Sequence, residues 1–317
     1  MAVLVVLIVV NLVLLFLLFR PVGALTAQPA NQSAGDGSPP ATKSSPMIRS
    51  TPSTTEQTTA ATPRVSQDPA PQTGSIEPAP AQRLLFAVSS KTAWRASVGD
   101  CNTPGMIERS TDGGASWKPI VRAGLAPIVR LGAEPSGDLF TIGGSSRSCS
   151  VRYVAYANDG KVTASTNNPI DAWFPTPTDR DEIIGPGDTK ATPCKGHTVG
   201  LAPRNLSQAM VTCANGALMS TRDSGKTWRR IGRIPNTLAI TSRGSRYWIA
   251  GANEDCEGIT VQSLAERSGG LRRGRTRCAP GLDVAGGQVA IDVTGGTIWL
   301  WSGNKIAIST DDGETWK

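Results

Sequence analysis

Histidine is almost absent from this sequence, in which His197 is the only one among 317 residues. Zinc sites use histidine and cysteine side chains at short, regular spacing, and the sequence contains neither a CxxC motif nor a Cys/His pair at such spacing. The acidic stretch at 311–314 looks like part of a calcium loop, but the ligand spacing of such a loop is missing. We therefore expect no metal and no other cofactor.

Large apolar side chains are nearly missing from residues 26–83, which are rich in Pro, Ala, Ser, Thr and Gln. Such a segment cannot bury enough apolar surface to offset its conformational entropy. We expect residues 21–83 to form a disordered linker that spaces a folded domain from a surface. Residues 84–317 remain to build the core, and a segment of that size fits one all-β domain.

Basic residues are missing before the apolar run at 2–19, and Arg20 follows it. The run has about 18 residues, as a spanning helix requires, whereas the apolar part of a signal peptide has about 7–15. We favour a transmembrane anchor over residues 1–20, with the folded domain on the extracytoplasmic face of a bacterial cell envelope. A signal peptide that is cleaved after Ala24 or Ala27 is the alternative.

A strong excess of charge is also missing. The net charge is +7, and from Leu84 onward 27 basic residues stand against 21 acidic ones. One basic run, at 271–277, reads Leu-Arg-Arg-Gly-Arg-Thr-Arg. Such a run can bind phosphate or acidic polymers, but a solvated loop is its more common role. We expect a solvated loop here, and no nucleic-acid partner.

An octapeptide that follows the pattern [ST]-x-D-x-G-x-[ST]-W occurs three times. The aspartate can accept hydrogen bonds from the backbone of its own turn, and the glycine can take the positive φ that closes the turn. The tryptophan can then start the next strand and pack between neighbouring sheets. The defining residues are Ser110, Asp112, Gly114 and Trp117, then Thr221, Asp223, Gly225 and Trp228, then Ser309, Asp311, Gly313 and Trp316.

The octapeptide resembles the Asp-box, or BNR repeat, of the sialidase-like propellers. That family includes sialidases, sortilin and a propeller-type photosystem assembly factor. The resemblance implies four-stranded blades in which each box joins the third and fourth strands. It implies little about function, because these relatives do unrelated things.

The spacing of the octapeptides allows the blades to be counted. The octapeptide glycines are 111 and 88 residues apart, and a blade takes about 40–50 residues. The second interval then holds two blades, with a weaker turn at 268–269. The first holds a hidden turn at 158–160 and a Pro-rich insertion at 165–196. We expect a monomeric β-propeller of five blades, with six as the alternative.

The sequence shows no strand that would close the ring. The sequence ends at Lys317, where a fourth strand of the last blade is expected to begin. The segment before Leu84 is too rich in proline to pair well as a borrowed strand.

All six cysteines lie after residue 100, and an even count behind an apolar leader predicts disulfides in an oxidising compartment. Alignment of the blades on their boxes places four of the cysteines between second and third strands, and Cys194 and Cys278 between blades. Both kinds of loop open on the face opposite the boxes. Of 15 possible pairings, we favour the sequential one, with Cys101–Cys149, Cys194–Cys213 and Cys256–Cys278.

The resemblance raises the question of a glycosidase. Sialidases use an arginine triad that binds the substrate carboxylate, a Tyr paired with a Glu as nucleophile, and an Asp as general acid. Tyr153 and Tyr156 fall on an expected third strand and Tyr247 on a second strand, so none lies on an innermost strand. The many arginines cannot be assigned to a triad from the sequence.

Two further signals fit structure better than catalysis. The segment 233–235 reads Arg-Ile-Pro, a motif of the first sialidase blade, but it follows the second octapeptide, where a connection between blades is expected. Glu254, Asp255 and Glu257 could contribute paired carboxylates but fit an exposed acidic turn. We expect a protein that is not an enzyme.

Three functions stay open. The first is a non-catalytic, membrane-anchored propeller that binds a protein or a glycan through its loop face. The others are an exo-acting glycosidase of sialidase type and an assembly factor for a membrane complex. The insertion at 165–196 offers a ligand loop, with Trp173, Phe174, Asp179 and Arg180 as contacts.

Overall fold

A computed structural model describes residues 76–317, except for 121–123, 135–136, 158, 170 and 268–269. The predicted anchor and residues 21–75 of the predicted linker lie outside the described residues. Within the described part of the chain, no helix is long and apolar enough to cross a bilayer.

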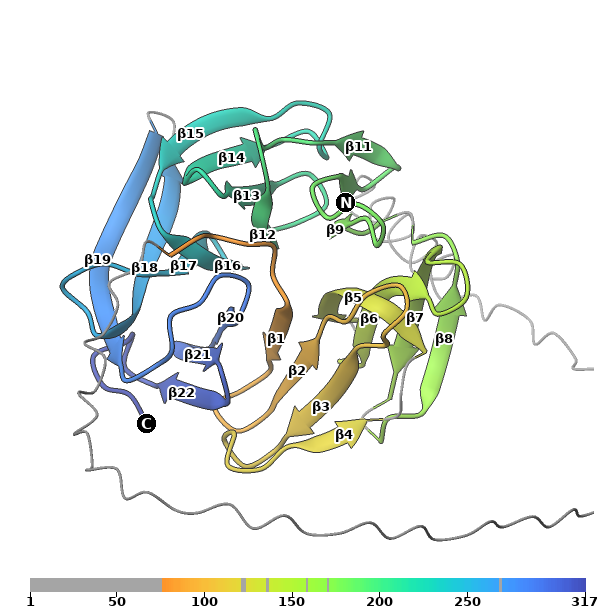
Figure 1. Cartoon of the computed structure of the whole chain (residues 1–317), viewed down its shortest axis with the longest axis horizontal. Coiled ribbons are helices and arrows are strands. Elements are labelled where there is room, and N and C mark those ends of the chain that lie inside the picture. The colour runs from red at the N-terminus through yellow and green to blue at the C-terminus, as the bar shows by residue number, and fades with distance from the viewer. Residues whose placement is uncertain (1–75, 121–123, 135–136, 158, 170, 268–269) are drawn as a thin grey trace, which may run out of the picture. The chain divides into compact units, whose positions relative to one another are not determined.

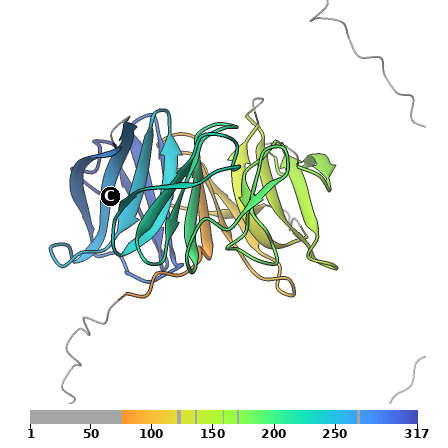
Figure 2. The same ribbon diagram turned by 90° about the horizontal axis from the view of Figure 1, so that it is seen from above.

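The described chain is all-β and forms six antiparallel sheets around a common axis (Figure 1). Figure 2 shows the same ring of sheets turned by 90°. Each sheet is a blade whose strands pair in chain order. Blades 1 and 2 consist of β1 (Arg83–Ala87), β2 (Ala93–Ser97), β3 (Met106–Ser110) and β4 (Lys118–Ile120), then β5 (Leu125–Ala133), β6 (Leu139–Ser145), β7 (Val151–Tyr156) and β8 (Val162–Thr166). Blades 3 and 4 consist of β9 (Phe174–Pro175), β10 (Ile183–Gly185) and β11 (Thr189–Ala191), then β12 (Thr198–Pro203), β13 (Ala209–Cys213), β14 (Ala217–Thr221) and β15 (Arg229–Arg233). Blades 5 and 6 consist of β16 (Thr237–Arg243), β17 (Arg246–Gly251), β18 (Gly258–Arg267) and β19 (Gly270–Pro280), then β20 (Val289–Thr294), β21 (Thr297–Ser302) and β22 (Lys305–Ser309).

The count of five blades is therefore wrong, and the alternative of six is correct. The segment at 165–196 contains the third blade, not a loop insertion. Its strands β9, β10 and β11 are two or three residues long and are interrupted by proline and glycine. Such short strands carry no alternating pattern that a sequence can show.

The blades are held together by apolar clusters that alternate with the sheets. Each of six buried clusters joins two neighbouring blades, and the cluster between blades 6 and 1 contains Ala87, Ala93 and Trp299. Over the described residues, the ring thus closes by packing between faces, and no strand there is shared by both blades. Blade 6 has three assigned strands, and Lys317 makes two backbone hydrogen bonds with Ile308 at the position where a fourth strand would start.

Polar contacts reinforce this closure. The buried carboxylate of Asp292 on β20 accepts a hydrogen bond from the Ala87 backbone N–H of β1 at 2.7 Å. The indole N–H of Trp299 donates to the Ser89 carbonyl at 3.0 Å. Residues 76–82, which were expected to belong to the linker, run beside blade 6, and Gln82 donates its backbone N–H to Gly287.

The three octapeptides form the expected turns. In the third, the Ser309 hydroxyl donates to Asp311 at 2.7 Å and accepts the Gly313 N–H at 2.8 Å. Thr315 donates both its N–H and its hydroxyl to the same carboxylate, at 2.9 and 2.6 Å. The other two turns repeat these contacts. All three pattern glycines have φ between 80° and 89°, as expected.

The tryptophans of these turns pack on the preceding blade. Trp117 meets Trp299 edge to face, with ring centroids 6.4 Å apart, and Trp228 meets Trp173 in the same way at 6.0 Å. Trp316 packs against the cluster between blades 5 and 6. The expectation of an aromatic plug between sheets is confirmed.

The cysteines form the three sequential disulfides. Cys101–Cys149 joins blades 1 and 2, Cys194–Cys213 joins the connection after blade 3 to blade 4, and Cys256–Cys278 lies within blade 5. Cys278 lies on β19, not between blades. Because a four-stranded meander begins and ends on one face, the disulfides share the face opposite the octapeptide turns.

The octapeptide turns predict a specific loss of stability in acid. Hydrogen bonds from the Ser or Thr before the tryptophan, and then from the first hydroxyl, lower the pKa of Asp112, Asp223 and Asp311 to about 2. An unfolded aspartate has a pKa of about 3.9, so this stabilisation is complete above about pH 4 and is lost as the pH falls toward 2. We expect the melting temperature to fall over this range, and to fall less in the variant with all three residues changed to Asn. The control changes the exposed Asp171, Asp188 and Asp255 to Asn, and an equal acid response in both variants would contradict the assignment.

Candidate functional site

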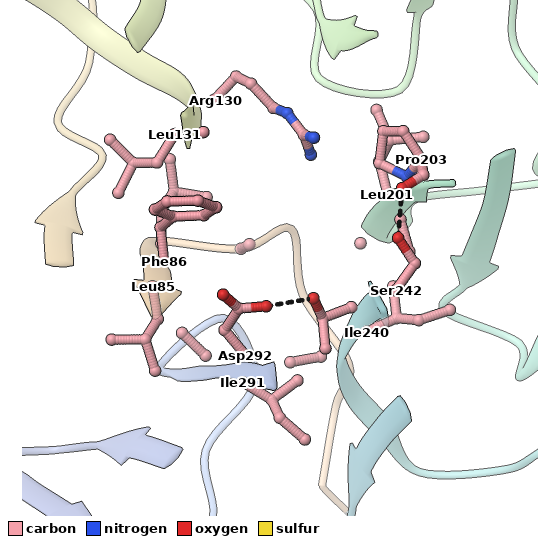
Figure 3. A pocket seen from close by; sticks show the side chains of 18 of the residues that line it. Leu85, Phe86, Arg130, Leu131, Leu201, Pro203, Ile240, Ser242, Ile291 and Asp292 are labelled. Atoms are coloured by element: carbon pink, nitrogen blue, oxygen red, sulfur yellow. Dashed lines mark hydrogen bonds between the residues drawn. The ribbon is translucent and has the colours of Figure 1, made fainter. Parts of the chain in front are cut away.

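A central cavity of about 630 Å³ lies where the inner strands of the blades meet. Residues of β1, β5, β9, β12, β16 and β20 line it, so every blade contributes a strand to its wall. The wall is equally polar and apolar, and Figure 3 shows the apolar side chains Leu85, Phe86, Leu131, Leu201 and Ile291 around it. The apolar half of the wall shields charges inside the cavity from bulk water and strengthens their effect.

The charges in this wall are nearly all positive. Five arginines line the cavity against one carboxyl group, that of Asp292, and no other lining residue is charged. The arginines are Arg83, Arg130, Arg180, Arg204 and Arg243. They come from positions far apart in the chain, and the ring alone brings them together.

Two of these arginines lie near the disulfide-bearing face. Arg83 opens β1, donates to the Gln288 side chain at 2.9 Å and to the Gly303 carbonyl, and stacks 4.4 Å from the centroid of Trp301. Arg180 donates to the Ala81 carbonyl. Neutral groups therefore orient both side chains, while the charges of Asp283 and Asp181 lie near enough to compensate part of the positive charge.

Two more lie toward the opposite face, where β12 and β16 end. Arg204 donates weakly to the Gly244 carbonyl at 3.4 Å and lies 5.4 Å from the ring centroid of Tyr247. Arg243 donates to the Thr294 hydroxyl at 2.9 Å. These hydrogen-bond partners are again neutral, although Asp292 lies near enough for its charge to interact with that of Arg243.

Arg130 is the exception, because its guanidinium has no fixed partner. It reaches into the cavity from β5, while Asp292 reaches in from β20 (Figure 3). Among the described residues, none forms a hydrogen bond or an ion pair with this guanidinium. Burial lowers the pKa of Arg130 to about 10, and the nearby charge of Asp292 only partly opposes this shift. Arg130 is partly exposed to the cavity, and a cation with free N–H donors in such a place is a binding site for an anion.

The hydrogen bonds of Asp292 connect strands of the ring and do not involve Arg130. The Asp292 side chain is buried, and besides the Ala87 N–H it accepts the Thr241 hydroxyl at 2.7 Å. Burial raises its pKa, although these hydrogen bonds and the Arg243 charge act in the opposite direction. The carboxyl group thus ties three inner strands together.

The residues expected in a ligand loop have other roles. Trp173 and Phe174 are each 3% exposed and pack in the clusters that flank blade 3, so the expectation of surface contacts there is wrong. The Asp179 carbonyl accepts the Thr176 hydroxyl within a local turn. Only Arg180 faces a cavity, the central one. The run at 271–277 is mostly exposed, as expected, but the expected loop is wrong because these residues belong to β19.

Tyrosine and glutamate come together at one place outside the cavity. Tyr247 is fully buried, and burial raises its pKa to about 12, with the charge of Glu266 adding to the shift. The Glu266 side chain is 4% exposed and pairs with Arg222 and Arg229. A nucleophile requires access and a lowered pKa, so this pair is structural.

No family model matches this chain, and no curated protein matches it. Among solved structures, a functionally unknown protein from Desulfotomaculum acetoxidans is 12% identical, covering 74% of this chain and 83% of that one, with a TM-score of 0.45. The six-bladed fungal lectin from Aleuria aurantia is 10% identical, covering 74% and 93%, with a TM-score of 0.45. YCF48 bound to a D1 peptide is 15% identical, covering 76% and 82%, with a TM-score of 0.29. Likeness at this level does not extend to function.

Substitution of Asp292 separates its hydrogen bonds from its charge. Asp292→Ala leaves the buried Ala87 N–H without an acceptor and should cost about 1–3 kcal/mol of unfolding free energy. Asp292→Asn can still accept from Ala87 and donate to Thr241, so it should cost about 1 kcal/mol or less.

The same pair predicts a pH dependence. Since folding raises the pKa of Asp292, the folded state binds the proton more tightly, and wild-type stability falls as the pH rises from about 3.9 through the folded pKa. Urea unfolding at several pH values should show this component in the wild type and not in Asp292→Asn. Equal pH profiles, or equal losses for Ala and Asn, would contradict the role assigned to the carboxyl group.

Proposed function

We propose that this protein is a non-catalytic binding propeller whose central cavity receives an anionic group of its partner. The observation that carries the proposal is the free guanidinium of Arg130 inside a cavity lined by four more arginines. A carboxylate, sulfate or phosphate fits such a site, because arginine donates two parallel hydrogen bonds to each. The group belongs to a protein or a glycan.

The inventory of the cavity supports binding over hydrolysis. Glycoside hydrolysis needs two carboxyl groups about 5–10 Å apart, or a tyrosine nucleophile with its glutamate. None of the described residues that line the cavity is a Tyr, a Glu or a His, and Asp292 is occupied by two hydrogen bonds.

The octapeptide turns support assignment to the Asp-box propellers. They have the repeat pattern, the same internal hydrogen bonds and a place between third and fourth strands in blades 1 and 4. We place the propeller on the extracytoplasmic face of a membrane, anchored through residues 1–20. The three disulfides support an oxidising compartment.

A sialidase-type activity is the second candidate, because the arginines that line the cavity are half of what such an enzyme needs. A fluorogenic sialoside assay on the full chain tests it. We expect no turnover above a boiled control, since the accessible nucleophile pair is missing from the described wall. Turnover that Arg130→Met abolishes would replace the binding proposal with the enzymatic one.

The binding proposal predicts stabilisation by small anions that depends on Arg130. Inorganic phosphate and succinate are the probes, each titrated at constant ionic strength against chloride. At about 100 times its Kd, a ligand adds about 2.7 kcal/mol, which raises the melting temperature of a domain this size by about 5–10 °C. Arg130→Met should remove this response without lowering the basal melting temperature, because it removes a partly desolvated charge that has no hydrogen-bond partner among the described residues.

The matched control is Arg246→Met, at an exposed arginine that opens β17 outside the cavity. It should keep the full anion response. A response that is equal in Arg130→Met and the wild type would contradict the proposal, as would no response of the wild type to either anion.

A further inference from the structure

The outermost strands of blades 4 and 5 carry an unusual density of arginine. We define the arginine edge as Arg229, Arg230 and Arg233 on β15 with Arg272, Arg273 and Arg275 on β19. All six side chains are exposed. The two strands belong to different sheets, so the fold and not the sequence run alone creates this surface.

The hairpin of β18 and β19 brings the two strands together. Leu271 packs in the cluster between blades 4 and 5, where it approaches Gly232 of β15. Arg273 donates to the Arg233 carbonyl at 2.7 Å. Like charges are therefore held side by side across a seam between blades, at an electrostatic cost that an anionic partner would remove.

Acidic residues neutralise only part of the arginine edge. Glu266 is shared by Arg229 and Arg222, at 2.8 and 3.0 Å. Glu314 is bound by Arg277 and lies 3.9 Å from Arg275. Among the described residues, no carboxylate pairs with Arg230, Arg233, Arg272 or Arg273, whose charges remain available.

Protection of a sheet edge against aggregation does not account for this set. A single charged residue serves that purpose, and the other outer strands carry one charged residue at most. The outer strand β4 carries one lysine, β11 carries one lysine, and β8 carries no charge. Six arginines on two edges exceed what protection requires.

We propose that the arginine edge binds a linear polymer with phosphate groups along its chain. Arginine matches phosphate oxygens with two hydrogen bonds, and Arg272, Arg273 and Arg275 follow one another over about 10 Å of β19 beside the arginines of β15. A bilayer surface fits less well, because the exposed large apolar residues among those described, Val88, Met106, Val162 and Leu206, all lie off these strands. Exposed aromatic rings for base stacking are also missing there.

Long-chain inorganic polyphosphate is the probe, and the full chain in mild detergent is the protein. The test variant combines Arg230→Ser, Arg233→Ser, Arg272→Ser and Arg273→Ser. The control combines Lys91→Ser, Lys118→Ser, Lys161→Ser and Lys190→Ser, four exposed lysines elsewhere, and changes the net charge equally.

The loss of four phosphate contacts should weaken binding about 100-fold and make the dependence of log K on log salt shallower. The control should change affinity far less, and both variants should keep the wild-type melting temperature. The test variant should keep the wild-type melting-temperature response to succinate, so failure of the cavity proposal and failure of this one are distinguishable.

Three results would overturn the proposal. The first is equal weakening in test and control variants, which would mean that net charge alone sets the affinity. The second is single-stranded DNA that binds more tightly than polyphosphate of equal charge. The third is unchanged polyphosphate binding in a test variant that loses its preference for phosphatidylglycerol over phosphatidylcholine vesicles, which would assign the edge to a membrane surface.

Discussion

The contact between blades 6 and 1 is the constraint on which the rest of the structure depends. A propeller is a chain of sheets in which each blade buries its face on the next, and the first and last must meet for the ring to close. Here Trp299 fills that junction against Ala87 and Ala93, while the Asp292 carboxylate binds the Ala87 N–H. Since none of the described strands is shared by both blades, the strength of this junction comes from side chains packed around Trp299 and from a few directed hydrogen bonds.

Closure also creates the chemistry of the centre. The inner strands converge on one cavity only when all six blades are in place, and five arginines and a single carboxyl group then line it. Neutral carbonyls, a hydroxyl and aromatic rings hold four of these arginines in position. Arg130 is left without such a partner, and desolvation inside the ring lowers its pKa. The carboxyl group that closes the ring is the same one that borders the proposed anion site.

The sequence predicted those parts of the fold that local chemistry determines. The octapeptides revealed the propeller and the register of its strands, and that register placed the cysteines on one face. The third blade escaped because strands as short as β9 leave no periodic signal. The cavity arginines were not predicted, because they are scattered in the sequence from Arg83 to Arg243 and line one cavity only after the ring closes. Applying the strand register to the first strand of each blade would have singled out Arg130, but not its lack of a partner.

The location of a bound anion tests the central claim most directly. Selenate is a phosphate-sized anion whose selenium scatters anomalously, so diffraction from a crystal grown at low selenate concentration would locate it. The account predicts a selenium peak inside the central cavity, with selenate oxygens within hydrogen-bond distance of the Arg130 guanidinium. A cavity that holds only water while selenate occupies other sites, or an Arg130 side chain turned away into the protein wall, would contradict it.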